Sequence, residues 1–180
     1  MSRRDTCEGF PCEGFIASEI VTQHPFVHIH SPMCDITLRP TRTDDAPTMT
    51  TLMTQLDYPT NEPQMRRRLE LLARNDTVGA IVAERNGAVV GMIGLRAEHG
   101  FEFDGVQGQI AALVVDEQFR GQGIGRLLVA AGEEWLRQRG AGRVMVTSAH
   151  RREDTHRFYE RLGYESTGLR FGKPLHSIAE

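Results

Sequence analysis

Apolar residues recur every three or four positions in three segments of this chain, which is the spacing of an amphipathic helix. The first predicted helix opens at Thr43 or Asp44 and is stopped by Pro59. The second begins at Pro63, because proline is favoured in the first helical turn. The second helix is expected to bury Met65, Leu69 and Leu72. The third and longest helix has its apolar stripe at Ile124, Leu127, Leu128, Ala131 and Trp135. Glu133 and Arg137 are expected to pair on its solvent side.

Short runs of apolar and β-branched residues predict strands. The expected strands span residues 35–41, 78–84, 88–98, 109–115 and 142–148. Asn86-Gly87 lies between the second and third of these, and this dipeptide is typical of tight hairpin turns. A last helix is expected to contain residues 156–164, with one more strand after it. The order β-α-α-β-β-β-α-β-α-β indicates an α+β domain with a mixed sheet.

Three alternating glycines, Gly121, Gly123 and Gly125, join a strand to the longest helix. Because glycine lacks a Cβ, this turn can adopt positive φ or let a ligand approach its backbone. It lies at a helix N-terminus, where free N–H groups and the positive end of the helix dipole favour an anion. Arg120 and Arg126 flank the turn and can add charge-assisted hydrogen bonds. We therefore predict a phosphate or pyrophosphate site, in preference to a plain strand-to-helix turn.

Two other phosphate-binding loops do not fit the spacing. The dinucleotide fingerprint G-x-G-x-x-G would require glycine at Arg126 or Leu128. The P-loop requires Gly-Lys followed by Ser or Thr, but Gly172-Lys173 is followed by Pro174. Hydrolysis of a nucleoside triphosphate therefore loses its main support.

The motif that does fit is R-x-x-G-x-G, read as Arg120, Gly123 and Gly125. It resembles the acetyl-CoA pyrophosphate loop of the GNAT superfamily of N-acetyltransferases. The resemblance extends upstream to the hairpin RNGAVVGMIGL and downstream to GRVMVTS and HRFYERLGY, the last of which is similar to the family's closing helix. It covers about residues 36–175 and is specific within residues 120–162.

This resemblance implies a GNAT fold, in which a mixed, mostly antiparallel central sheet is flanked by helices and two central strands splay apart to hold CoA. It implies direct transfer of an acetyl group from acetyl-CoA to the primary amine of a small molecule, as in the aminoalkylphosphonate and aminoglycoside N-acetyltransferase branch. The backbone of the strand would hold the pantetheine, and one of its N–H groups would donate to the thioester oxygen. The implied cofactor-binding residues are Leu113, Val114, Val115, Arg120, Gly121, Gln122, Gly123, Ile124, Gly125, Arg126 and Arg152.

Tyr159 matches the tyrosine that lies near the CoA sulfur in many members and acts as the general acid. The transfer is chemically reasonable because a phenol, with a pKa of about 10, and a thiol, at about 8.5, have similar acidities. On the residues alone, a half-buried aromatic beside Phe158 is an equal alternative. The family usually has Asn where this chain has Arg152. The role of this arginine has three alternatives. It could contact a CoA phosphate, or it could form a basic rim with His150 and Arg151 over the cofactor or an anionic acceptor. It could also lie in a solvated turn.

The general base has no clear candidate, because the central strand carries no carboxylate where many relatives have one. The remaining candidates are Glu98, His99, Glu102, Asp104 and His150; a water relay or an already neutral amine would also suffice. Several acids could pair with a cationic acceptor, or could simply be solvated. They are Asp57, Glu62, Glu98, Glu102 and Asp104.

The composition agrees with one domain and a small-molecule reaction. The chain has 180 residues, of which 39% are hydrophobic, and a net charge of −3, which argues against a basic nucleic-acid surface. No apolar run reaches the roughly 20 residues that span a bilayer, and no secretory signal is visible. We expect a cytoplasmic protein with neither membrane nor nucleic-acid partners, and leave a homodimer open.

Residues 1–34 are expected to be a poorly ordered tail, and residues 35–180 a single domain. The tail has no sustained period and is interrupted by prolines. In or beside it lie Cys7, Cys12, Cys34, His24, His28 and His30. Their spacing matches no familiar zinc finger, and an odd number of cysteines argues against a disulfide framework. We expect no metal site.

Two other functions fit parts of the pattern. A non-catalytic acyl-CoA sensor would keep the glycine turn and Val114–Val115, but it would not need Tyr159. A protein or peptide N-acetyltransferase would keep all of these residues. The tyrosine therefore favours an enzyme, and leaves its acceptor open.

Overall fold

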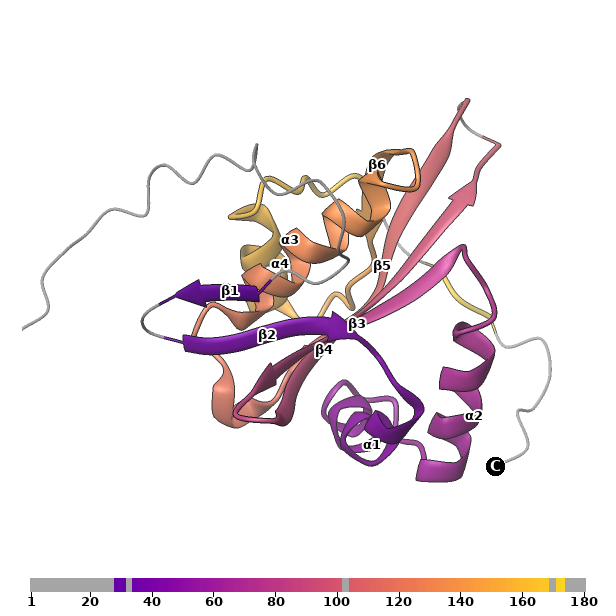
Figure 1. Ribbon diagram of the computed structural model, residues 1–180. Helices are drawn as coiled ribbons and strands as arrows, with labels where there is room; N and C mark the ends of the chain where they lie inside the picture. Colours follow the sequence, from indigo (N-terminus) through magenta and orange to yellow (C-terminus); the bar gives the residue numbers. More distant parts are fainter. Residues whose placement is uncertain (1–27, 32–33, 102–103, 169–170, 174–180) are drawn as a thin grey trace, which may run out of the picture.

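The computed structural model describes residues 28–31, 34–101, 104–168 and 171–173 (Figure 1). Its strands are β1 (His28–Ser31), β2 (Cys34–Pro40), β3 (Val78–Arg85), β4 (Ala88–His99), β5 (Val106–Val115) and β6 (Ala141–Val146). Its helices are α1 (Ala46–Gln55), α2 (Glu62–Leu72), α3 (Ile124–Arg137) and α4 (Glu153–Glu160), with 3₁₀ turns η1 (Thr43–Asp45) and η2 (Glu117–Phe119). None of the helices in these ranges has the length and apolar character needed to cross a membrane.

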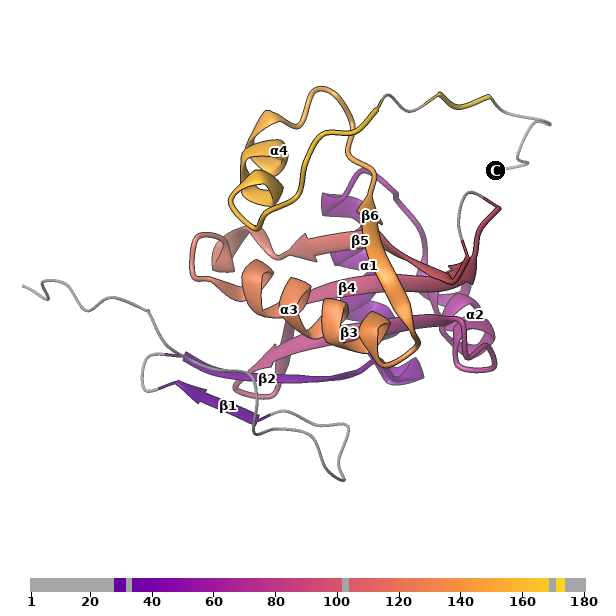
Figure 2. The ribbon, with the colours of Figure 1, turned by 90° about the horizontal axis from the view of Figure 1, so that it is seen from above.

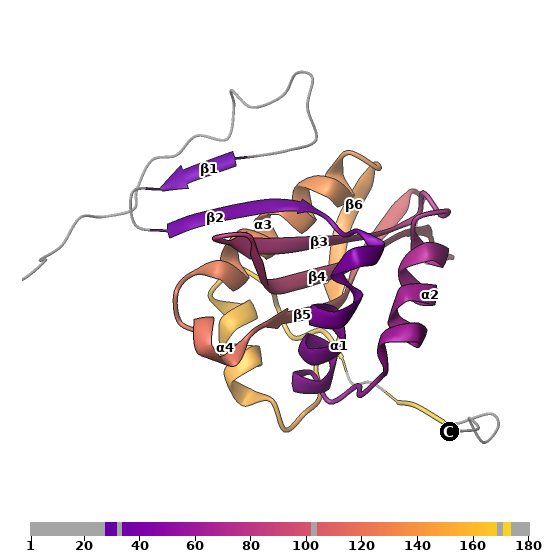
Figure 3. The same ribbon diagram turned by 60° about the horizontal axis from the view of Figure 1, so that its bottom comes forward.

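The strands form one six-stranded sheet in their sequence order. Each strand is antiparallel to its neighbour, except that β6 runs parallel to β5. α3 lies on one face of the sheet, and α1 and α2 lie on the other (Figure 2, Figure 3). This arrangement confirms the predicted α+β domain with a mixed, mostly antiparallel sheet flanked by helices.

Two hydrophobic cores form because successive residues of a strand point to opposite faces of the sheet. In β3, Val82 packs with the residues of α1 and α2, whereas the next residue, Ala83, packs with α3. α4 joins the α3 core through Tyr159. The two cores therefore hold α1 and α4 on different sides of the sheet.

α3 faces the sheet differently from the prediction. Its buried residues are Ile124, Leu128, Val129, Gly132 and Leu136, whereas Leu127, Ala131 and Trp135 are only partly buried. Gly132 explains the difference, because a Cβ at this position would lie 2.8 Å from Cδ1 of Ile93. The helix therefore packs against the sheet at a glycine. A prediction based on the spacing of apolar side chains does not count glycine as a buried position.

Most other elements follow the prediction. Asn86 and Gly87 form the expected hairpin turn, with φ values of 51° and 80°. Leu72 is exposed rather than buried. Residues 165–168 and 171–173 form no strand, so the strand predicted after the last helix is absent from the part that the structure describes.

β1 lies within residues 1–34, the predicted tail, and pairs antiparallel with β2. Residues 1–27, which include Cys7, Cys12 and His24, lie outside the described residues. The domain boundary after residue 34 and the lack of a metal site therefore stay predictions.

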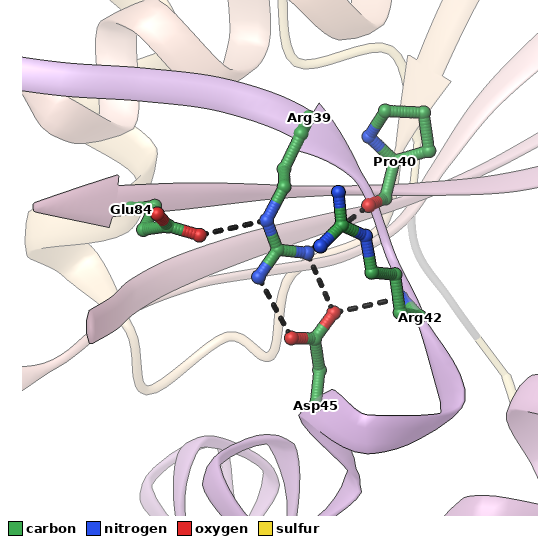
Figure 4. Close-up of polar contacts among 5 residues, drawn as sticks. All are labelled: Arg39, Pro40, Arg42, Asp45 and Glu84. Carbon is green, nitrogen blue, oxygen red and sulfur yellow. Dashed lines mark hydrogen bonds and ion pairs between the residues drawn. The ribbon is translucent and has the colours of Figure 1, made fainter. Parts of the chain in front are cut away.

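Arg39 joins β2 to β3 and to η1, the turn before α1 (Figure 4). Its two terminal nitrogens donate to the Asp45 carboxylate at 2.8 Å, and its Nε donates to Glu84 at 2.7 Å. The N–H of Arg42 donates to Asp45 at 2.7 Å. Burial alone would raise the pKa of Asp45, but these hydrogen bonds outweigh burial and hold the pKa below its ordinary value. The cluster thus fixes the start of α1 to the sheet.

We expect Asp45→Asn to lower the free energy of unfolding near pH 7 by about 2 kcal/mol. The variant loses the charge-assisted hydrogen bonds between Arg39 and the Asp45 carboxylate, whereas Arg39 keeps its ion pair with Glu84. Folding lowers the pKa of Asp45. Its contribution is therefore present above the unfolded pKa, about 3.9, and is lost as the pH falls through the folded value. Urea unfolding near pH 7 and near pH 3 measures both effects. Equal stability of variant and wild type near neutrality would show that the cluster contributes nothing.

Candidate active site

The C-terminal half of β5 separates from β6. Their parallel pairing ends where Ile110 faces Val146, whereas β5 continues to Val115 beside β4. Within the described residues, Leu113–Val115 therefore have no strand partner on the β6 side. Backbone groups on that edge lie open to a ligand.

A β-bulge marks the point where the two strands part. Along β4, Leu95 faces Ile110 and the neighbouring Gly94 faces Ala112, so Ala111 is an extra residue in β5. A bulge bends its strand and increases the local twist. The bend lies at the last residue that pairs with β6, which is where the splayed strands implied by the family resemblance begin.

A cleft of about 910 Å³ opens beside this strand edge, between the end of α1, the glycine turn and α4. Tyr159 lines it. It is also lined by every predicted cofactor residue except Gln122, namely Leu113, Val114, Val115, Arg120, Gly121, Gly123, Ile124, Gly125, Arg126 and Arg152. The side chain of Gln122 instead accepts a hydrogen bond from Arg85 at 2.8 Å. The structure thus gathers residues from α1, β5, η2, α3 and α4 around one space.

The glycine turn combines two roles. Gly121 and Gly123 have φ values of 77° and 81°, a conformation that favours glycine, and a Cβ at either would meet open space. Gly123 is the N-cap of α3 and offers no side chain to its first N–H groups, which stay open to an anion. Gly125 differs, because a Cβ there would lie 3.4 Å from the ring of Phe158. The first two glycines leave these N–H groups unobstructed, and the third lets α3 and α4 pack closely.

Six arginines and three acids line the cleft. Those held in ion pairs are Arg151, Arg152 and Arg157. Arg120 donates through Nε to the carbonyl of Val115 at 3.0 Å, which ties it to the end of β5. Arg126 and Arg161 are exposed and have no partner among the described residues. These two guanidinium groups are the most available to an anionic ligand.

Tyr159 lies in the wall of the cleft and is 6% exposed. The centroid of its ring lies 5.2 Å from the ring centroid of Phe158 and 5.2 Å from that of Tyr164. The hydroxyl of Tyr164 donates to Glu133 at 2.7 Å, whereas that of Tyr159 has no partner among the described residues. Burial raises the pKa of Tyr159 above its ordinary value. Its hydroxyl is therefore protonated at neutral pH and uncommitted, as a proton donor requires.

Asp57, which the sequence left open between a partner of a cationic acceptor and a solvated acid, is paired with two arginines. Arg151 and Arg152 each donate to its Oδ2, at 2.8 and 2.7 Å. Arg152 also donates to the carbonyl of Leu56 at 2.7 Å. Hydrogen bonds from Arg152 and Arg151 hold the pKa of Asp57 below its ordinary range. Arg152 is thus engaged across the cleft and is not part of a free solvated turn.

The predicted base candidates that the structure describes do not line the cleft; they are Glu98, His99, Asp104 and His150, and Glu102 lies outside the described residues. Several lining residues were assigned no site role from the sequence; they include Gln55, Leu56, Phe119, Glu153, Asp154, Thr155, Arg157 and Arg161. Gln55 links the end of α1 to the segment after β5, because it donates to Asp116 and accepts from the N–H of Glu117 and from Arg120. These partners lie at least 61 positions away, and a single sequence carries no signal for such contacts.

Comparisons with known proteins agree with this geometry. A family model described as the Acetyltransferase (GNAT) family matches residues 45–164. The chain is 44% identical over 94 residues to the aminoalkylphosphonate N-acetyltransferase of Salmonella typhimurium, a match that covers 52% of this chain and only 61% of that relative. It is 29% identical over 130 residues to an uncharacterized N-acetyltransferase of Bacillus subtilis, covering 72% of this chain and 88% of the relative.

The same fold occurs in the solved structure of the aminoglycoside N-acetyltransferase AAC(6')-Iy in complex with CoA. That structure matches with a TM-score of 0.70 at 16% identity, and the match covers 79% of this chain and 97% of the other. The family model itself extends from η1, through the glycine turn and α4, to Tyr164. By sequence, fold and cleft, the chain belongs to the GNAT family of acetyltransferases.

Proposed function

We propose that this protein transfers the acetyl group of acetyl-CoA to the primary amine of a small molecule. One observation carries the proposal: a single cleft brings together an open strand edge, a helix N-terminus built for an anion, and a buried tyrosine with a free hydroxyl. Each of the three groups matches a need of acetyl transfer, which requires a polarised carbonyl, a held cofactor and a proton for the thiolate.

The cleft residues fit CoA at two places. The open backbone of Leu113–Val115 would hold the amide-bearing pantetheine arm. The N–H groups at Gly123 and in the first turn of α3, together with Arg126, would hold the pyrophosphate. Gln122 would contribute its backbone alone, since its side chain is bonded to Arg85.

When bound, acetyl-CoA supplies the acetyl thioester. A backbone N–H of β5 would donate to the thioester oxygen as negative charge develops there. The Tyr159 hydroxyl would donate its proton to the departing sulfur as the carbon–sulfur bond breaks and the carbon–nitrogen bond forms. No carboxylate or histidine is assigned as base; the amine enters neutral or loses its proton to water.

A small-molecule acceptor is supported by the Salmonella relative, whose name specifies an aminoalkylphosphonate. The test is thiol release from acetyl-CoA with a panel of aminoalkylphosphonates, aminoglycosides, polyamines, simple amines and peptide N-termini. We expect turnover with at least one small amine and none with peptides. Tight binding of acetyl-CoA without turnover of any amine would instead support a sensor, and turnover confined to peptides would support a protein N-acetyltransferase.

A further inference from the structure

An ion pair crosses the cleft between segments that are 95 positions apart in the chain. Asp57 follows α1, whereas Arg151 and Arg152 precede α4, and both arginines converge on one oxygen of the Asp57 carboxylate. Arg152 is further held toward α1 by the carbonyl of Leu56. Two guanidinium groups with one shared acceptor form a site for an anion, and the protein fills it with its own side chain.

The backbone at Asp57 indicates that this carboxylate serves a purpose other than ending α1. Asp57 has φ of 68°. The N–H of Tyr58 donates to the carbonyl of Met53, and that of Asp57 to Thr54, which together form a Schellman motif. Glycine is the usual residue at this left-handed position, and asparagine and aspartate are the other residues that adopt it most readily. The helix end therefore does not require a carboxylate, whereas the two arginines opposite both donate to it.

The ion pair between Asp57 and the two arginines is also exposed enough for another anion to replace the Asp57 carboxylate. Asp57 is 60% exposed, and an exposed ion pair contributes little to stability because water solvates the separated charges. Arg152 donates to the carbonyl of Leu56, just after α1, and α1 lies on the face of the sheet opposite α3 (Figure 3). Tyr159 lines the same cleft. An anion held by these arginines would therefore lie in the same cleft as Tyr159, with side-chain partners that differ from the backbone N–H groups of the glycine turn.

We propose that Arg151 and Arg152 bind an anionic group on the acceptor amine, and that Asp57 is the internal counter-ion which this group replaces. The proposal rests on the acetyltransferase function above and narrows its acceptor to an amine that also carries a phosphonate, phosphate or carboxylate. The two guanidinium groups match the oxygens of such an anion.

The test measures KM and kcat for the full chain at saturating acetyl-CoA. The acceptors are 2-aminoethylphosphonate, O-phosphoethanolamine and β-alanine, with n-propylamine as the neutral counterpart; their ranking separates the three anions. We expect the preferred anionic amine to exceed n-propylamine in kcat/KM by about tenfold or more, and Arg151→Met or Arg152→Met to remove this preference while the KM for acetyl-CoA stays within about twofold.

Two further variants sharpen the result. Asp57→Asn keeps a side chain that tolerates left-handed backbone, and it should lower the KM for anionic amines because no internal carboxylate competes. Arg137→Met removes an exposed arginine of α3 outside the cleft and should leave every constant unchanged. Equal use of anionic and neutral amines by the wild type would overturn the proposal. So would an arginine variant that raises the KM for acetyl-CoA alone, since these arginines would then hold the cofactor.

Calorimetric binding of 2-aminoethylphosphonate, with CoA present, separates this proposal from the proposed function. Binding that requires Arg151 and Arg152, without turnover of any amine, would uphold the anion site and overturn the acetyltransferase. Turnover that depends on neither arginine would support the acetyltransferase and overturn the anion site.

Discussion

Tyr159→Phe should lower the rate of acetyl transfer on the order of 10²-fold while leaving the affinity for CoA nearly unchanged. The variant keeps the ring and its contacts with Phe158 and Tyr164, so only the proton donor is lost. Because burial raises the pKa of Tyr159, the hydroxyl stays protonated through the neutral range. The wild-type rate should therefore not fall between about pH 7 and pH 9 through deprotonation of Tyr159. Steady-state thiol release against pH, with CoA binding by calorimetry, measures both quantities.

Tyr164→Phe is the matched control. It also removes a tyrosine hydroxyl from the same aromatic cluster, but that hydroxyl donates to Glu133 and does not line the cleft. We expect this variant to lose about 1 kcal/mol of stability and to keep its rate. If Tyr159→Phe turns over as fast as the wild type, the tyrosine only packs, and water or another group protonates the sulfur.

Gly123→Glu should weaken acetyl-CoA binding on the order of 10²-fold and abolish the rise in melting temperature that the cofactor causes. A glutamate at the N-cap of α3 places a negative charge where the pyrophosphate is proposed to bind. The protein itself does not obstruct the new side chain, since a Cβ at this position meets open space. No protein atom is therefore displaced, and the remaining cost within the protein is the backbone strain of a side chain at φ 81°.

Gly140→Glu separates this effect from backbone strain. Gly140 has φ of 79°, close to the 81° of Gly123, and its Cβ would also meet open space, but it follows the other end of α3. Both variants should lose similar intrinsic stability, and only Gly123→Glu should lose the thermal response to acetyl-CoA. An unchanged response in Gly123→Glu would place the pyrophosphate elsewhere.

Local chemistry explains which features the sequence predicts well. A hairpin at Asn86-Gly87 and a glycine turn before α3 depend on neighbouring residues, and both form as expected. The separation of β5 from β6 was expected through family resemblance alone. The β-bulge at Ala111 cannot be predicted from the composition of the strand or from the alternation of its apolar residues.

Contacts between distant segments account for the failures. Glu133 was expected to pair with Arg137 one helical turn away. Instead it accepts from Tyr164, 31 positions along the chain, while Arg137 pairs with Glu134. Likewise, acidic residues of loops look alike in the sequence, and only the fold distinguishes Asp57, which meets two arginines, from a solvated acid.

The bulge at Ala111 also determines which side of β5 each later residue occupies. Before it, Ile110 packs toward α3; after it, Leu113 and Val115 pack toward α3 and Val114 toward α1. In an unbroken strand Val114 would share the face of Ile110. Deletion of one residue here would exchange the two faces of the strand end, which would turn Val114 toward α3 and Leu113 and Val115 toward α1. The length of this strand is therefore constrained more tightly than its composition. In a lineage of such proteins, insertions and deletions should accumulate at the hairpin tips and be absent between Ile110 and Val115.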